Sequence, residues 1–489
     1  MKTIQIHPAD NVAVALEDLP GIPAGHKVAL RDFEAGEQVV KYGFPIGHTI
    51  HAVPKGALID HHDIQTNLSG TLDYKDVRSS MDVSSCPLSL ASSHPSTFSG
   101  YLRPDGQVGI RNELWVIPTV GCVSGIVRRV VNRLKHEVFH EGEGVDAIVG
   151  FSHNYGCSQL GDDHENTRRI LRDMVHHPNA GGVLVVGLGC ENNQPRDFEA
   201  FCGDYDRERV RFMVSQEVEG DEEEYAFRQL TELYRRACTN RRTPQPLSKL
   251  RVGLKCGGSD GFSGITANPL LGRFSDWLCQ EQGGTTVLTE VPEMFGAETI
   301  LMRRCATPEL LQQTIDLIND FKTYFLSHGQ PVGENPSPGN KAGGISTLEE
   351  KALGCTQKSG SSPVCGVLAY GERIGEGSGL HLLSAPGNDL VASTALAAAG
   401  CQLVLFTTGR GTPFATFVPT LKVSTNTALA QAKPHWIDFN AGRLIEGMSM
   451  DDLLLQFREA VLAVCEGRPT QSEERHFAEI AIFKNGVTL

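Results

Sequence analysis

Short apolar runs, separated by Gly, Pro and Asp turns, fill the first 75 residues of the chain. None has the three-to-four spacing of a helix face, and each is short enough for a β-strand. We therefore predict a small β-rich domain over residues 1–75. Its candidate strand residues are Ile4, Ile6, Val12, Val14, Val28, Leu30, Val39 and Val40.

Ser and Pro are frequent in residues 76–100, a composition typical of a linker. Beyond it, strand-length apolar runs alternate with longer amphipathic stretches, which predicts an α/β fold of mostly parallel, helix-covered sheets. We expect its two halves at 101–245 and 246–489. Predicted strands are 114–120, 145–151, 183–186 and 403–407, and predicted helices are 125–137, 166–176 and 227–242.

Composition narrows the class of protein. With 40% hydrophobic and 21% charged residues the chain is typical of a globular protein, and 489 residues are too many for one hydrophobic core. A formal net charge of −14 argues against a nucleic-acid partner, and no apolar run approaches the ~18 residues of a membrane span. Because the first residues lack the segments of a secretion signal, we predict a cytoplasmic protein, compatible with a homo-oligomer.

Four cysteines are the first candidates for chemistry. Cys122, Cys157, Cys190 and Cys256 each have a glycine neighbour and follow a predicted strand. Ligands bind beyond the carboxyl ends of parallel strands, and thiolates bind soft or borderline metals such as iron. The irregular spacing is a weak metal signal, and each cysteine taken alone is better explained as a buried thiol in a tight turn. The repetition of the pattern makes that explanation weaker for all four together.

Polar residues accompany these turns. His153 and the acids before His164 suit either metal binding or acid–base chemistry, although Asp162 and Asp163 also suit the cap of a following helix. The histidines at 61 and 62 are more typical of a solvated surface. Glu191 follows Cys190 directly.

Gly-rich loops in the second half suit an anionic ligand. The loop CGGSDGFSG carries Ser259 and Asp260, and its backbone N–H groups can hold a carboxylate. The stretch ENPSPGNKAGG is too rich in Gly and Pro for a helix, and it carries Asn335, Asn340 and Lys341. In TTGRGTP, Arg410 lies between two glycines and suits fork-like binding of a carboxylate.

Long motifs extend this pattern over nearly the whole chain. They are KYGFPIG, IRNELWVIPTVGCV, SHNYGCSQLGDDH, VVGLGCENNQ, CGGSDGFSGITANPLLGRFSD, TVLTEVPEMFGAE, ENPSPGNKAGGISTLEEKALGCTQK and TTGRGTP. Together they resemble the altronate/galactarate dehydratase family. The resemblance implies an N-terminal SAF-type β domain, a linker and a large α/β catalytic region. It also implies dehydration of a hexonate with ferrous iron, and the stretch GHKVALRDFEAGEQVVKYG is similar to the galactarate enzymes.

The expected reaction is metal-dependent dehydration of D-altronate to 2-keto-3-deoxy-D-gluconate, with galactarate or a related sugar acid as the alternative substrate. A non-catalytic sugar-acid binding protein is the alternative from another class. Iron, as a single ion or an iron–sulfur cluster, would be bound by residues among Cys122, His153, Cys157, Cys190, Glu191 and Cys256. His153 and Lys341 are the candidate bases, and the substrate-binding candidates are Ser259, Asp260, Asn335, Asn340 and Arg410.

Overall fold

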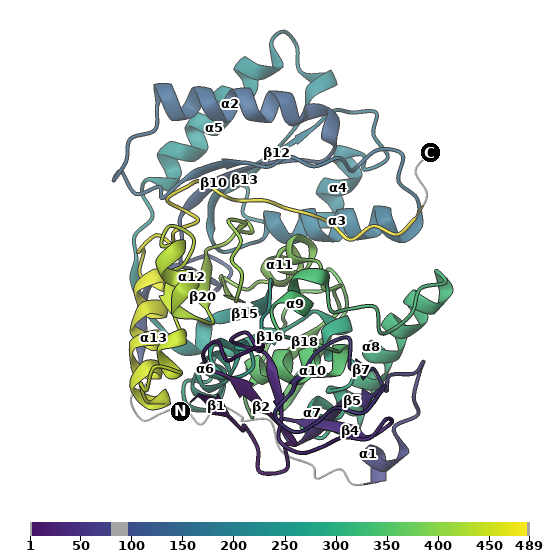
Figure 1. The fold of residues 1–489 in the computed structure, drawn as a ribbon. Helices are drawn as coiled ribbons and strands as arrows, with labels where there is room; N and C mark the ends of the chain where they lie inside the picture. Colours follow the sequence, from purple (N-terminus) through teal and green to yellow (C-terminus); the bar gives the residue numbers. More distant parts are fainter. Residues whose placement is uncertain (1, 80–95, 487–489) are drawn as a thin grey trace.

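The computed structural model describes residues 2–79 and 96–486. It consists of an N-terminal β unit and two α/β units, one lying above the other in the view of Figure 1. The predicted linker at 76–100 falls mostly on residues 80–95, which lie outside the described residues. None of the helices within the described part of the chain is both long and apolar enough to cross a membrane.

The N-terminal unit is built from two small antiparallel sheets, in agreement with the predicted β-rich start of the chain. The first has the order β1 (Thr3–Ile4), β2 (Val12–Ala15), β3 (Lys27–Ala29) and β6 (Leu58–Ile59); the second has the order β4 (Gln38–Lys41), β5 (Phe44–Thr49) and β7 (Ile64–Gln65). Helix α1 (Lys75–Ser79) follows. The core of this unit continues into Ala297, Ala352 and Leu353 of the second α/β unit, so the two pack as one.

The first α/β unit contains a fully parallel sheet of four strands. Its order is β11 (Ile148–Gly150), β10 (Glu113–Pro118), β12 (Ala180–Gly187) and β13 (Val210–Val214). Helices α2 (Ser124–Glu137) and α5 (Glu222–Ala237) cover one face, and α3 (Gly161–Val175) and α4 (Pro195–Cys202) cover the other (Figure 1). A small sheet of β14 (Thr243–Pro246), β8 (Thr97–Leu102) and β9 (Val108–Gly109) precedes the second unit.

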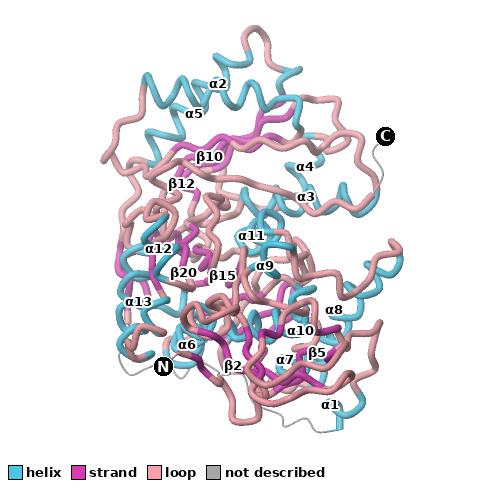
Figure 2. Tube along the Cα trace, viewed as in Figure 1, coloured by secondary structure: helices cyan, strands magenta, loops and turns pink. Residues whose placement is uncertain are grey.

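The second α/β unit contains a parallel sheet of seven strands. Its order is β17 (Val364–Leu368), β18 (Gly379–Leu383), β16 (Thr285–Leu288), β15 (Arg251–Cys256), β19 (Leu403–Thr408), β20 (Thr420–Ser424) and β21 (Phe439–Asn440). Its helices are α6 (Ala267–Asp276), α7 (Glu298–Met302), α8 (Pro308–Ser327), α9 (Pro338–Ala342), α10 (Leu348–Thr356), α11 (Asp389–Ala398), α12 (Thr427–Ala432) and α13 (Met450–Cys465). Strands β15 and β20 of this unit lie below the first sheet in the view of Figure 2.

One hydrophobic core joins the two α/β units. Trp115 and Ile117 of the first sheet pack in the same cluster as Leu396 of α11 and Phe417 of the second unit. The final described residues return to the first unit, where the backbone N–H of Asn485 donates to Asp163 at 2.9 Å. This shared core fixes the two parallel sheets relative to each other, because a close-packed interior resists sliding.

Several predicted elements differ from the observed ones, and the helix predicted at 166–176 spans Gly161–Val175. The helix predicted at 227–242 spans Glu222–Ala237, because Asp221 caps its N-terminus and Pro244 lies in the following strand. The stretch predicted to contain no helix forms α9, where Ser337 makes a capping box with Asn340 and Pro338 occupies the first turn. Proline is favoured at that position, since its missing N–H has no helical partner there.

Candidate active site

A buried group of two thiols and one carboxylate lies at the carboxyl end of the second sheet. Cys256 is the last residue of β15, Glu293 follows β16 in a 3₁₀ turn, and Cys355 lies on α10. The two sulfur atoms are 3.3 Å apart. Glu293 Oε2 lies 3.5 Å from Cys256 Sγ and 3.3 Å from Cys355 Sγ. Each residue is at most 5% exposed, so the group is shielded from water.

Buried lysines surround this group. Lys351 Nζ donates to Glu293 Oε1 at 2.7 Å and to Asn335 Oδ1 at 3.2 Å. Lys358 and Lys255 both pair with Glu290, the former at 2.7 Å. Glu290 has a left-handed backbone with φ of 68°. Strained backbone in a non-glycine residue is concentrated at functional sites, where the surrounding contacts maintain it.

The charges set the protonation of the group. Burial alone would raise the pKa of Glu293, but the positive charges of Lys351, Lys255 and Lys358 outweigh it and lower that pKa. The pKa of Cys355 is raised well above its ordinary value by its hydrogen bond with Cys256 and by burial. Glu293 is therefore an ionised ligand, whereas the Cys355 thiol gives up its proton only to a strongly binding cation.

The donor set fits a metal ion. Two sulfurs and one carboxylate oxygen that all lie within 4.8 Å of one another can bind one cation at ordinary bond lengths. Three protein ligands are the number typical of catalytic metal sites, which keep a position for water or substrate. Thiolate ligands favour soft or borderline metals, a class that includes iron. Lys351 occupies only Oε1 of Glu293, so Oε2 is available to the ion.

A small cavity adjoins Cys355 between the N-terminal unit and the second α/β unit. It is lined by Lys41 and Tyr42 on one side and by Ser259 and Lys351 on the other. Ser259 is 2% exposed, and its hydroxyl has no hydrogen-bond partner in the described structure. A buried unpaired hydroxyl is costly, so this one marks where a polar ligand group or water fits.

The other predicted substrate-binding residues gather around the same loop. Asn340 Nδ2 donates to the Ser259 carbonyl at 2.9 Å, and Asn335 contacts Lys351. Asp260 accepts hydrogen bonds from Thr425 at 2.9 Å and from Asn426 at 3.1 Å, and therefore ties this loop to the end of β20. Exposed Arg410 donates its backbone N–H to the Gly258 carbonyl at 3.1 Å.

The N-terminal unit closes this side of the site through buried ion pairs. Lys27 Nζ lies 2.8 Å from Glu350 Oε2, and Lys41 Nζ lies 2.7 Å from Glu350 Oε1. Burial would raise the pKa of Glu350, but the two lysines lower it to about 2. Gly264 is required here, because a Cβ on it would collide with the Tyr42 hydroxyl. The loop and the β unit are thus in close contact.

The remaining predicted residues lie elsewhere. Lys341 is half-buried on α9. Cys122, Cys157 and Cys190 are exposed on the first α/β unit, apart from Cys256.

His153 is buried, with Nε2 2.8 Å from the Pro118 carbonyl and Nδ1 accepting from the Tyr155 N–H at 3.1 Å, so both ring nitrogens have backbone partners. Glu191 accepts from the Thr119 hydroxyl at 2.7 Å and from the Leu188 N–H at 3.0 Å.

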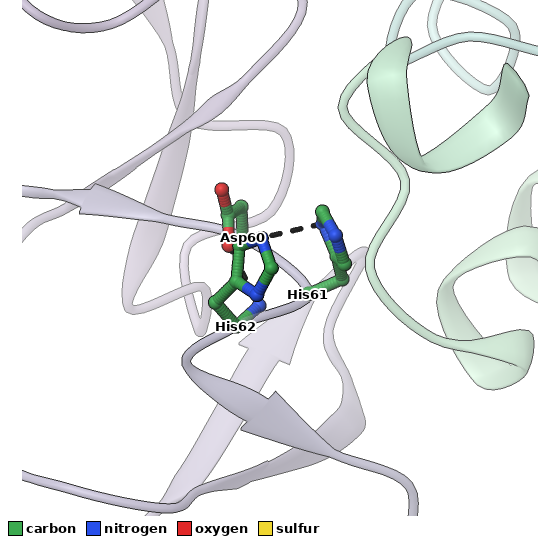
Figure 3. A group of neighbouring side chains, drawn as sticks. All are labelled: Asp60, His61 and His62. Carbon is green, nitrogen blue, oxygen red and sulfur yellow. Dashed lines mark hydrogen bonds and ion pairs between the residues drawn. The ribbon is translucent and has the colours of Figure 1, made fainter. Parts of the chain in front are cut away.

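A second group of potential ligands lies in the N-terminal unit. Asp60, His61 and His62 offer ligand atoms within 4.8 Å of one another, but none of the three is buried. Figure 3 shows His61 directed toward the neighbouring α/β segment, with Asp60 and His62 side by side. Burial lowers the pKa of His61, and although Asp60 opposes this, His62 and Lys341 act in the same direction. The buried thiol group is the more suitable metal centre.

Sequence reasoning identified Cys256 but missed its partners. Glu293 ends the motif TEVPE, yet nothing in its spacing showed that it would face a thiol. Cys355 also has a glycine neighbour, but it lies on a helix and not after a strand. A cysteine in this position is not predicted by the rule that ligands follow the carboxyl ends of strands. Lys351 and Lys358 lie on α10 and in the turn after it, and only the fold shows that they are buried.

Comparison with known proteins gives the family. Residues 20–67 match the altronate/galactarate dehydratase SAF domain, residues 100–238 match the D-galactarate dehydratase/altronate hydrolase second domain, and residues 247–488 match the D-galactarate/altronate dehydratase C-terminal domain. The chain belongs to the altronate/galactarate dehydratase family. The fold expected from the motifs, an antiparallel SAF domain followed by parallel α/β units, is confirmed.

Similar proteins cover the full length of the chain. The altronate dehydratase of Escherichia coli (strain K12) is 52% identical, with 100% of both chains covered. The altronate dehydratase of Bacillus subtilis (strain 168) is 54% identical, with 99% of both covered. The galactarate dehydratase (L-threo-forming) of Escherichia coli (strain K12) is 34% identical over 91% of this chain and 88% of its own length.

Proposed function

We propose that the protein is a cytoplasmic hydro-lyase that converts D-altronate to 2-keto-3-deoxy-D-gluconate, with ferrous iron bound by Cys256, Glu293 and Cys355. The observation that carries the proposal is the buried convergence of two thiols and a carboxylate beside an unpaired serine hydroxyl. The similarity to two altronate dehydratases over essentially the whole chain supports the choice of substrate.

The reaction removes a proton from carbon 2 and a hydroxide from carbon 3 of the aldonate, and the enol formed becomes the 2-keto acid. The carbon-2 proton is weakly acidic, and hydroxide is a poor leaving group. A bound divalent ion would supply Lewis acidity toward the substrate carboxylate and the 3-hydroxyl. The protein residues must hold the ligands in place, orient the sugar acid and keep bulk water out.

Lys351 positions the carboxylate of the centre. Its ammonium holds Glu293 Oε1, which keeps Oε2 beside the two sulfurs, and its second contact reaches Asn335 in the adjacent loop. Burial lowers the pKa of Lys351, but its attraction to Glu293 prevails and raises that pKa above the ordinary value. Lys351 is therefore a fixed cation, which suits attraction of an anionic substrate and not removal of a proton.

Residues around the small cavity would orient the substrate. The Ser259 hydroxyl is free to bind a substrate hydroxyl, and Asn335 presents an amide beside Lys351. Asn340 and Asp260 hold the Gly-rich loop that carries Ser259. Exposed Arg410 would attract the substrate carboxylate at the entrance, where a guanidinium can bind both of its oxygens.

Lys341 is the candidate for the general base. It lies on α9, the short helix whose Asn340 contacts the Ser259 loop. Both ring nitrogens of His153 already have backbone partners, which makes Lys341 the better choice of the two. Lys341 at this position would accept the carbon-2 proton.

Substrate entry requires the cavity to widen. Its volume of about 10 Å³ is room for about one water molecule. A six-carbon acid therefore needs separation of Tyr42 in the N-terminal unit from the loop at 257–264. This requirement gives the SAF-type unit a direct part in substrate selection.

The test is an anaerobic assay of the iron-supplemented protein on D-altronate and galactarate side by side. We expect formation of 2-keto-3-deoxy acid from altronate, at least about 100-fold faster than from galactarate, because a pocket built for specific hydroxyls rejects a mismatched acid. Turnover of galactarate alone would assign the galactarate reaction instead. Stoichiometric binding of either acid without turnover would favour the non-catalytic sugar-acid binding protein.

A further inference from the structure

Three exposed thiols on the first α/β unit have no part in the proposed catalytic centre. Eleven cysteines are free in the described residues, and among them Cys122, Cys157 and Cys190 are the three that are exposed. Cysteine is among the residues most often buried in proteins. The gathering of all three exposed thiols on one unit therefore needs a specific explanation.

The three cysteines follow three neighbouring strands. Cys122 lies between β10 and α2, Cys157 between β11 and α3, and Cys190 between β12 and α4. Strand β10 pairs in parallel with both β11 and β12. Because adjacent parallel strands are only about 4.8 Å apart, their carboxyl ends bring the three turns to one edge of the sheet.

Hydrogen bonds join these turns into one surface. The Gly121 N–H donates to the Tyr155 carbonyl at 3.0 Å, which ties the first turn to the second. The Ser158 N–H donates to Asn192 Oδ1 at 2.7 Å, and the Asn193 N–H donates to the Gly156 carbonyl at 2.9 Å. Each cysteine thus lies within two residues of a residue that is hydrogen-bonded to a neighbouring cysteine turn. Their relative positions are fixed by the backbone and not by chance side-chain contacts.

The buried side chains of His153 and Glu191 stabilise these turns through hydrogen bonds to the backbone. The ring of His153 bridges the Pro118 carbonyl and the Tyr155 N–H, just before Cys157. The carboxylate of Glu191 accepts from the Leu188 and Gly189 N–H groups, just before Cys190. Both buried side chains hold the turns in shape. The sulfurs have only long polar contacts, from the Ser158 hydroxyl to Cys157 at 3.9 Å and from the Gln216 amide to Cys190 at 3.6 Å.

The helix ends make the same edge favourable for negative charge. Helices α2, α3 and α4 begin after the cysteine turns, and within residues 2–79 and 96–486 no side chain caps the N-terminus of any of them. Uncapped N–H groups and the helix dipole stabilise thiolates and anionic ligands nearby. Three such ends around three cysteines suit a centre with several negatively charged sulfurs.

We propose that Cys122, Cys157 and Cys190 bind an iron–sulfur cluster in which one iron has no protein thiolate. The three sulfurs do not all lie within 4.8 Å of one another. A single ion with metal–sulfur bonds of about 2.3 Å holds its sulfurs within about 4.6 Å, so one ion is too small for this site as it stands. In a cluster each cysteine binds a different iron, and the sulfurs lie farther apart.

This site is separate from the proposed catalytic centre. Cys256 ends a strand of the other sheet and is buried with Cys355, whereas the three thiols here are exposed. The two proposed iron sites can be distinguished by measuring the iron and the sulfide content of the protein separately. The cluster is the one that contains acid-labile sulfide, and it does not depend on which sugar acid is the substrate.

The experiment measures iron, acid-labile sulfide and visible absorbance on the full chain, purified without oxygen and reconstituted with ferrous iron and sulfide. We expect about four acid-labile sulfides per chain. We also expect a broad visible absorbance that arises from sulfide-to-iron charge transfer. In Cys122→Ala, Cys157→Ala and Cys190→Ala, tested singly and as a triple variant, at least about nine-tenths of the sulfide should be lost. Circular dichroism checks that each variant is folded.

Two controls separate this proposal from the proposed function. Cys238→Ala removes a half-buried thiol of the same unit and should keep the full sulfide content. Cys355→Ala should lose altronate turnover and still keep the sulfide. A protein that takes up no sulfide, that binds iron or zinc at these thiols without sulfide, or whose folded triple variant retains the cluster would overturn the proposal.

Discussion

The Ser259 hydroxyl is buried, has no hydrogen-bond partner in the part of the chain that the structure describes, and lies next to the cavity beside Cys355. If it binds a substrate hydroxyl, Ser259→Ala should raise the KM for altronate about fivefold with a smaller change in kcat, since one neutral hydrogen bond contributes about 1 kcal/mol. Steady-state kinetics measure the split. Ser393→Ala is the matched control, because that serine is also buried and unpaired but lies on α11. Equal effects of the two variants would remove Ser259 from the substrate site.

Asp173 makes stability depend on pH. Burial raises its pKa from 3.8 to about 7 despite the nearby Arg172, and its Oδ2 has no hydrogen-bond partner among the described residues. An acid with a raised folded-state pKa binds its proton more tightly when folded, so stability is lost as pH rises between those two values, by up to about 1.4 kcal/mol per pH unit.

In Asp173→Asn this contribution should vanish. Urea unfolding at pH 5 and pH 8 measures it: the free energy of unfolding of the wild type should fall more steeply with pH than that of the variant. The same pH dependence in both proteins would show that Asp173 is not the group responsible.

Some residues of the candidate site can be predicted from the sequence, and others cannot. Cys256 could be predicted, since a strand followed by a Gly-rich turn places it at the ligand-binding edge of a sheet. The loop residues Ser259, Asn335 and Asn340 could be predicted from composition. Glu293 and Cys355 could not, because their meeting with Cys256 depends on how η5 (Val291–Met294) and α10 pack against β15. Lysines on these elements are ordinarily solvated, and only the fold buries them.

At the scale of elements, Glu350 joins the SAF-type unit to α10. It is buried between Lys27 and Lys41, so Glu350→Gln leaves two buried lysines without a counter-charge. We expect a loss of about 3–5 kcal/mol in the free energy of unfolding, or local release of the N-terminal unit. Hydrogen exchange over residues 12–65 and urea unfolding measure the two effects.

The control for this element is an exposed pair in the same unit. Glu37→Gln removes the ion pair with Arg31, both of which are more than a third exposed, and should change the free energy of unfolding far less, because water screens an exposed pair. Similar losses in the two variants would contradict the role of Glu350 as the buried joint between the units.

Elements were predicted well where their period was clear. The alternation of apolar strands and amphipathic helices gave the parallel sheets, since both faces of such strands are buried and covered. Errors arose where local capping decides the outcome, as at α9, where Ser337 and Pro338 start a helix in a Gly-rich stretch. Composition alone does not show that a capping box compensates for poor helix formers.

At the scale of the whole molecule, two parallel sheets each present cysteines at the carboxyl end. In the second sheet the thiols are buried with a carboxylate beneath the SAF-type unit, and in the first they are exposed. The sequence showed the same Gly–Cys turn in both halves and did not distinguish these two settings, because burial depends on which units pack over each sheet edge.

The central claim is that Cys256, Glu293 and Cys355 form the metal centre that dehydrates altronate. The most direct measurement is altronate turnover and bound iron in Cys355→Ala against Cys279→Ala, a buried thiol of the same unit that contacts Thr286 and not the centre. We predict that Cys355→Ala loses one iron per chain and at least about 1,000-fold in kcat/KM, while Cys279→Ala keeps both within about threefold. A folded Cys355→Ala protein with wild-type iron and turnover would contradict this account.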